Sequence, residues 1–150
     1  MNNDWFECKV RYDKTMETGL LKKTTETYMV EALSFTEAER RFIEEMTPFI
    51  SGEFTVTDIK RGHLAEIFES ENAAADRWFK AKVAYITLDE KTGAEKRTPQ
   101  LILVQATDFR DAVSNLDRCM AGTLGDWVIV NIAETPIMDV FHYKQAEGGE

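Results

Sequence analysis

The hydrophobic residues of the segment Trp5–Tyr12 recur at every second position. One face of this segment carries Phe6, Cys8, Val10 and Tyr12, and the other carries Trp5, Glu7, Lys9 and Arg11. This alternation, with its aromatic and β-branched residues, predicts a half-buried strand. The polar segment Asp13–Leu21 contains Gly19 and predicts a hairpin turn. Alternation resumes over Thr24–Ala32, which we expect to form a second strand.

A helix is predicted to follow, because Ser34-Phe35-Thr36-Glu37 fits a capping box. Its apolar stripe at helical spacing consists of Phe35, Ala38, Phe42, Met46 and Phe49. Pro48 and Gly52 should end it. We expect Phe54–Arg61 to form a third strand, with Phe54, Val56, Asp58 and Lys60 alternating against Thr55, Thr57 and Ile59. The short apolar segment Leu64–Phe68 predicts a fourth strand.

The same order of elements recurs in the second half of the chain. Trp5–Tyr12 aligns with Trp78–Tyr85, and the register continues through Thr18-Gly19 with Thr92-Gly93, Val30 with Val104, Phe35 with Phe109, Met46 with Met120 and Ile59 with Ile132. The predicted elements are the strands Trp78–Ile86 and Lys96–Ala106, a helix capped by Asp108, and the strands Trp127–Ala133 and Pro136–Phe141. Pro99 predicts a sheet edge within the second of these strands.

The chain is therefore predicted to be α+β, a tandem duplication of a ββαβ(β) unit with two helices and mainly antiparallel sheets. Repeat 1 covers about residues 5–68 and repeat 2 about 78–141, with an acidic linker or short helix at 69–77 and a tail at 142–150. A repeat of this length buries too small a share of its surface to be stable alone. We therefore expect one compact pseudo-dimeric domain, in which the repeats are related by a pseudo-twofold axis.

Composition adds a strong negative charge to this picture. The 150 residues are 43% hydrophobic, enough for a core, and carry a formal net charge of −9. That charge disfavours approach to phosphates, favours a partner with a basic surface, and also serves solubility. No apolar run reaches the ~18–20 residues of a membrane span, and Met1–Asp4 lacks the features of a signal peptide. We expect a cytoplasmic protein that binds no membrane.

The sequence contains no phosphate loop, dinucleotide fingerprint, nucleophile elbow or histidine zinc motif. We interpret Cys8 and Cys119 as small core residues, and His63 and His142 as loop residues without the spacing of metal ligands. The acidic residues single out no catalytic pair. The sequence therefore predicts a protein that is not an enzyme and that has no cofactor, metal site or catalytic residues.

One pattern suggests a binding surface. Trp5, Lys9 and Arg11 lie on one face of the first strand, and Trp78, Lys80 and Lys82 lie on its counterpart. Aromatic rings interleaved with cations are typical of surfaces that bind single-stranded nucleic acid. The alternative interpretation is that both tryptophans fill an apolar seam between the repeats, with lysines at its rim.

Four segments carry a family resemblance. They are Trp5–Val10 (WFECKV), Ala32–Ala38 (ALSFTEA), Asp76–Val83 (DRWFKAKV) and Ala133–Phe141 (AETPIMDVF). Together they resemble an uncharacterised domain-of-unknown-function family of proteins of this size from Bacteroidetes and their phages. The resemblance covers nearly the whole chain. It implies a bacterial or phage-borne origin, and it implies no activity, cofactor or site residues.

Two binding functions are favoured on this basis over a third alternative, an unrecognised enzyme, which would need a deep pocket lined by converging polar groups. The first is a phage- or mobile-element-associated accessory protein that binds single-stranded nucleic acid through the tryptophan and lysine faces. The second is an acidic protein-binding module, an inhibitor or nucleic-acid mimic acting on a host or phage protein. Any site built from matched residues should occur twice. A site that occurs once should come from positions where the repeats differ.

Overall fold

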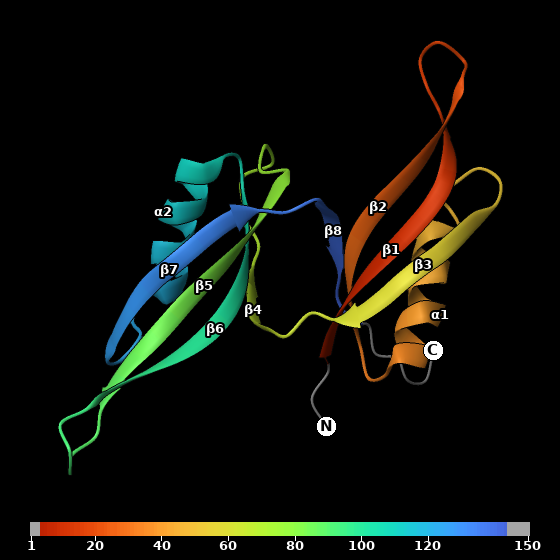
Figure 1. The fold of residues 1–150 in the computed structure, drawn as a ribbon. Helices are drawn as coiled ribbons and strands as arrows, with labels where there is room; N and C mark the ends of the chain where they lie inside the picture. Colours follow the sequence, from red (N-terminus) through yellow and green to blue (C-terminus); the bar gives the residue numbers. More distant parts are fainter. Residues whose placement is uncertain (1–3, 144–150) are drawn as a thin grey trace, which may run out of the picture. The chain divides into compact units, whose positions relative to one another are not determined.

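The computed structural model describes residues 4–143, and residues 144–150 of the predicted tail 142–150 lie outside them. The chain forms β1 (Asp4–Thr15), β2 (Leu21–Ala32), α1 (Phe35–Met46), β3 (Phe54–Arg61), β4 (Leu64–Phe68), β5 (Arg77–Leu88), β6 (Glu95–Ala106), α2 (Phe109–Met120), β7 (Asp126–Glu134) and β8 (Ile137–Phe141) (Figure 1). The predicted α+β class, with two helices and mainly antiparallel sheets, is confirmed. No described helix is long and apolar enough to cross a membrane.

The described chain divides into two compact units of matching topology. Unit 1 contains residues 4–63 and 137–143, and unit 2 contains Leu64–Pro136. The sheet of unit 1 has the order β3-β1-β2-β8, and that of unit 2 has the order β4-β6-β5-β7. Each unit therefore takes its last strand from the other repeat. That the whole chain behaves as a single compact pseudo-dimeric domain stays a prediction.

The two-residue connectors explain this exchange of strands. In unit 1, β1 is antiparallel to both β2 and β3, and β8 is parallel to β2, so the position of β8 is parallel to β3. If β4 were to occupy that position in its own repeat, the chain would have to cross about three interstrand spacings, ~14 Å. The connector Gly62-His63 spans three Cα–Cα steps, which reach at most ~11 Å. A parallel crossover needs about a dozen residues, so β4 cannot take the place beside β2. It pairs instead with β6 of unit 2.

Equivalent hydrogen bonds fix the chain at both crossings. The Gly62 N–H donates to the carbonyl of Trp5 (2.7 Å), and the Thr135 N–H donates to the carbonyl of Trp78 (2.9 Å). His63 adopts a φ of 53°, a left-handed conformation that turns the chain directly after β3. The second crossing, Thr135-Pro136, is equally short, so the same argument keeps β8 from the place beside β6, and β8 pairs with β2 of unit 1.

A second pair of hydrogen bonds holds the chain beyond each exchanged strand. After β8, the Tyr143 N–H donates to the Glu31 carboxylate (2.8 Å). After β4, the Ser70 N–H donates to the Gln105 side-chain oxygen (2.9 Å). Arg41, buried on α1, donates to the main-chain carbonyl of His142 (2.7 Å). The duplication thus extends to the tethers of the exchanged strands.

Both helices begin as the sequence predicts. The Ser34 hydroxyl accepts from the Glu37 N–H (3.1 Å), and the Glu37 carboxylate accepts from the N–H of Leu33, one residue before the cap (2.8 Å). In α2 the Asp108 carboxylate accepts from the Asp111 N–H (2.8 Å). These bonds satisfy N–H groups that a helix leaves without intrahelical partners.

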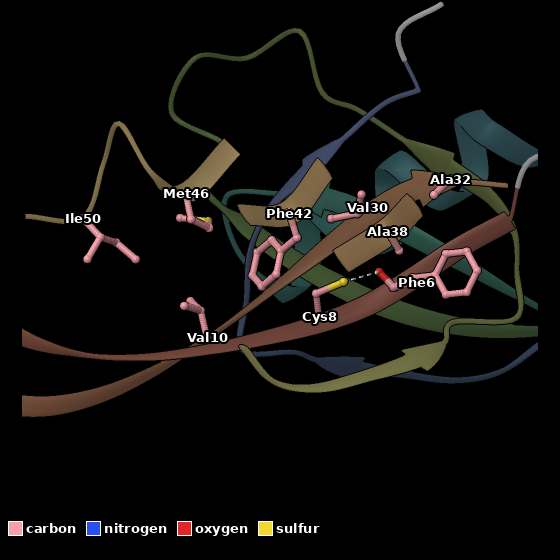
Figure 2. Packing of buried hydrophobic residues seen from close by; sticks show 9 residues of the cluster. All are labelled: Phe6, Cys8, Val10, Val30, Ala32, Ala38, Phe42, Met46 and Ile50. Atoms are coloured by element: carbon pink, nitrogen blue, oxygen red, sulfur yellow. Dashed lines mark hydrogen bonds between the residues drawn. The ribbon is translucent and has the colours of Figure 1, made fainter. Parts of the chain in front are cut away.

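The core of unit 1 lies between α1 and the sheet. Figure 2 shows Phe6, Cys8 and Val10 of β1 facing the side chains of Phe42 and Met46 from the helix. The members of this cluster are Phe6, Cys8, Val10, Val30, Ala32, Ala38, Phe42, Met46 and Ile50. At the ends of the predicted stripe Phe35 is 45% exposed and Phe49 is 75% exposed, so its interior positions alone are buried.

The predicted strict alternation of inward and outward side chains along β3 is wrong. The pairing of β1 with β3 shifts between Lys9, opposite Asp58, and Val10, opposite Val56, which leaves Thr57 as an extra residue. Such a bulge reverses the faces beyond it, so Val56 and Ile59 both pack against the core. The predicted linker 69–77 contains no helix, and its last residue already belongs to β5.

Strand exchange predicts that a mutation in one repeat will loosen the sheet of the other. Phe141 of β8 stacks on Tyr28 with ring centroids 5.6 Å apart, and Phe68 of β4 packs on the core of unit 2. We expect Phe141→Ala to raise amide hydrogen exchange in β1 and β2, and Phe68→Ala to raise it in β5 and β6. Because both rings are half-buried, the cost should be about 2 kcal/mol, below the ~3–5 kcal/mol of a fully buried phenylalanine. If amide hydrogen exchange rose instead in the sheet strands of the mutated repeat, the pairing of β4 and β8 with the opposite repeats would be contradicted.

Candidate functional site

The first predicted binding set lies on the face of the unit 1 sheet opposite α1. Trp5 is half-buried, with its ring edge-on to His142 at a centroid distance of 5.2 Å. Lys9 is half-buried and Arg11 is exposed. Between them along the strand, Glu7 forms an ion pair with Lys60 (3.1 Å). This face therefore offers part of one indole and two cations, interrupted by a carboxylate.

The second predicted set is placed differently, although its sequence pattern is the same. Trp78 is only 2% exposed, and Lys80 and Lys82 are half-buried. An indole with so little accessible surface offers almost no area on which a base can stack. The structure thus distinguishes the two sets, which the alternating pattern had treated as equivalent.

A cavity of about 310 Å³ in unit 1 brings together residues that the sequence analysis did not propose for binding. It lies beside the last turn of α1, over the sheet where β8 begins. Its walls come from β1, β2, the segment around the end of α1, and β8, and they comprise Tyr12, Glu26, Tyr28, Met46, Phe49, Ile50, Met138, Asp139 and Phe141. Its volume is near the lower limit of ligand pockets, roughly 300–1,000 Å³, so it suits a single side chain.

Glu26 is held in place by the tyrosines of this pocket. The Tyr28 hydroxyl donates to the Glu26 carboxylate (3.1 Å). Burial, followed by the charge and hydrogen bond of Glu26, raises the pKa of Tyr28, and the same causes raise the pKa of Tyr12. Both phenols therefore stay protonated, and the Tyr28 hydroxyl holds Glu26 as an acceptor.

Aromatic faces and a second carboxylate complete the pocket. Tyr28 stacks on Phe141 with an interplanar angle of 15°, while Phe49 and Met138 at the mouth are 75% and 51% exposed. The charge of Asp139 also contributes to the raised pKa of Tyr28, which places this carboxylate on the same site. Aromatic faces attract cations, and desolvated sites strengthen that attraction. The arrangement is therefore suited to an organic cation such as an ammonium or a guanidinium.

The pairing of Glu26 with Tyr28 occurs in one repeat only. In the register of the duplication, Glu26 corresponds to Gln100 and Tyr28 to Ile102, since Tyr28 lies opposite Cys8 as Ile102 lies opposite Ala81. This difference between the repeats is the sequence signal that could have identified the pocket. The alignment could not place Asp139 and Phe141 beside Tyr28, because they reach unit 1 through the exchange.

No group of three or more histidine, cysteine or acidic side chains suited to a metal occurs within residues 4–143. His142 lies with Nδ1 3.9 Å from the Glu31 carboxylate, and His63 occupies the first crossing. Cys8 is buried and Cys119 is half-buried, and both are free thiols. Burial raises the pKa of Cys119 to about 11, which disfavours the nucleophilic thiolate.

Ionisation of the Cys8 thiol should make the free energy of unfolding depend on pH in the alkaline range. Burial, with smaller contributions from the charges of Glu7 and Asp58, raises its pKa from 9.0 to about 12. Since the folded state favours the protonated thiol, this stabilisation is complete below pH 9 and is lost as the pH rises toward 12. We expect the free energy of unfolding to fall over that interval by denaturant titration. Cys8→Ala, which introduces the residue found at Ala81, should reduce the decline, and an equal decline in both proteins would contradict this origin.

Comparison with known proteins places the whole described chain in one family model. The model described as Domain of unknown function (DUF4494) matches residues 4–143. No curated protein matches the sequence.

Proposed function

Because the chain belongs to the DUF4494 family, a domain of unknown function, we propose its role from the geometry of the site. We propose that the protein is a non-enzymatic binding module that recognises a protein partner with a basic surface. Its pocket in unit 1 receives a lysine or arginine side chain of that partner. The observation that carries the proposal is the pairing of Glu26 and Asp139 with aromatic walls in a cavity of side-chain size.

The energetics support a cationic ligand over an apolar one. A cation over an aromatic face contributes about 0.5–2 kcal/mol, depending on its desolvation. Hydrogen bonds to Glu26 would add a charge-assisted contribution, and Tyr28 already orients that carboxylate. The net charge of −9 raises the rate of encounter with a basic surface over longer distances.

The proposal extends to the biological setting. We place the module in the cytoplasm of a bacterium, as a phage- or mobile-element-associated accessory protein of Bacteroidetes or their phages. An acidic module that covers a basic surface can act as an inhibitor or as a nucleic-acid mimic, because such surfaces commonly bind phosphates. The family resemblance and the acidic composition support this setting.

Replacement of Glu26 by glutamine should weaken the binding of a cationic side chain. We expect the affinity for N-acetylarginine amide, measured by calorimetry or by chemical-shift titration, to fall about tenfold, which corresponds to ~1.4 kcal/mol. Phe49→Ala should also reduce it, because that ring lines the pocket.

Gln100→Glu provides a matched control at the equivalent position of unit 2. The double variant Glu26→Gln, Gln100→Glu keeps the net charge of −9 and should bind as weakly as Glu26→Gln alone. Recovery of wild-type affinity in the double variant would show that overall charge, and not the pocket, attracts the ligand. Absence of binding to the wild-type protein would reject the proposed function.

One observation supports a second candidate function, the binding of single-stranded nucleic acid. Trp5 remains partly exposed on the same face as Lys9 and Arg11, so single-stranded nucleic acid can be bound there through one stacking platform. For this function we expect titration with a single-stranded oligonucleotide at low salt to quench tryptophan fluorescence. Trp5→Phe should lower the affinity less than Lys9→Ala combined with Arg11→Ala, and added salt should abolish binding. No binding at low salt would remove this candidate.

A further inference from the structure

We propose that the open edge of β2 over Leu21–Glu26 is where an extended segment of the basic partner adds as a further strand. A cationic side chain of that segment, lying opposite Glu26, would enter the pocket of unit 1. This inference rests on the proposed function, since it specifies how the partner delivers its cation.

The edge is open because β8 covers only part of β2. β1 pairs with β2 from Leu21 to Ala32, whereas β8 pairs with β2 only between Thr27 and Val30. No strand within residues 4–143 pairs with the other edge of Leu21–Glu26. Most of this segment is solvent-exposed. An open strand edge presents unpaired N–H and C=O groups that another chain can bind.

The register of the duplication shows which backbone groups point outward. In unit 2 Pro99 lies opposite Ala84, and a proline cannot donate to the ladder, so this must be a pair without hydrogen bonds. Thr25 lies opposite Arg11 in the same register. Its N–H and C=O therefore point away from β1, toward the open edge.

An independent hydrogen bond gives the same direction. The carbonyl of Trp5 accepts from the Gly62 N–H at the end of β3, so it points away from β2. Because the β1–β2 register is continuous, every second residue from Trp5 to Arg11 has the same orientation. Arg11 and Thr25 thus form a pair whose backbone groups face outward on both strands.

The corresponding edge of unit 2 lacks one of the backbone donors that an added strand would use. β4 pairs with β6 from Leu101 onward, which leaves Glu95–Gln100 open on that side. Pro99 lies in this stretch and has no N–H to offer an added strand. The predicted association of Pro99 with a sheet edge therefore applies locally. The charged pocket and the edge that can accept a strand occur together, in unit 1.

The side chains of β2 define which partner sequence fits. A residue directly opposite Glu26 would lie on the α1 side of the sheet, about 5 Å away between Cβ atoms, next to the pocket that Glu26 lines. A lysine or arginine there is attracted. Four residues along, a cation opposite Lys22 is repelled. The fitting segment therefore has one cation, with a neutral or acidic residue four positions away.

Thr25→Pro tests the inference by introducing the residue that unit 2 tolerates at the same register. The probes are N-acetylarginine amide and a short peptide of alternating valine and threonine with one central arginine. We expect Thr25→Pro to weaken the peptide at least tenfold and to leave the small probe unchanged. Thr25→Val, which keeps the N–H, should bind both as the wild type does. Peptide affinity unchanged by Thr25→Pro would overturn strand addition.

Two further measurements keep the outcomes distinct. A peptide with N-methylated backbone amides should bind the wild-type protein no better than the small probe, which tests the edge even if Thr25→Pro perturbs the hairpin. Light scattering would detect a wild-type dimer that Thr25→Pro dissociates. Such a dimer would identify a second copy of this chain as the occupant of the edge and overturn the proposal of a separate basic partner. If the wild type binds neither probe, the proposed function itself fails; if it binds only the small probe, strand addition alone fails.

Discussion

The length of two connectors governs the architecture of this protein. Gly62-His63 and Thr135-Pro136 are too short to carry a strand across its own sheet to the vacant place beside the second strand of the repeat. The exchanged strands β4 and β8 therefore complete the sheets of the opposite repeats. Each repeat supplies one strand to the sheet of the other repeat. The stability of each unit therefore depends on residues far away in the sequence. Phe141 illustrates this dependence, since it packs on Tyr28, more than a hundred positions earlier in the chain.

The exchange also creates the candidate site. The pocket needs Asp139, Met138 and Phe141 from the end of repeat 2 against Tyr12, Glu26 and Tyr28 from the beginning of repeat 1. A duplicated scaffold would supply two such pockets, but the second strand of repeat 2 carries Gln100 and Ile102 where unit 1 has Glu26 and Tyr28. Pro99 adds a second asymmetry, because it removes a backbone donor from the free strand edge of the unit that lacks Glu26. Both differences lie in the second strand of the repeat, whereas the matched tethers of the exchanged strands are retained.

Local chemistry explains why much of the fold was predictable. Ser34 and Asp108 cap their helices because short polar side chains satisfy free N–H groups at the first turn. The alternation in Trp5–Tyr12 directs Phe6, Cys8 and Val10 to the core because side chains alternate across a strand. Thr57 breaks the same rule, since a bulge depends on pairing with a neighbouring strand. Trp5 and Trp78 share one pattern yet differ in burial, because periodicity identifies the faces of a strand without specifying what covers them.

The sequence by itself determined the duplication, the order of strands and helices, the helix caps and the inward-facing core residues. These follow from periodicity and short-range hydrogen bonding, which are written within a few neighbouring residues. Only the tertiary structure decided which sheet receives β4 and β8, that Trp78 is buried, and that Asp139 lies beside Tyr28 and Glu26. Those features arise from contacts between distant segments, where the reach of a short connector restricts the pairing more than any local preference does.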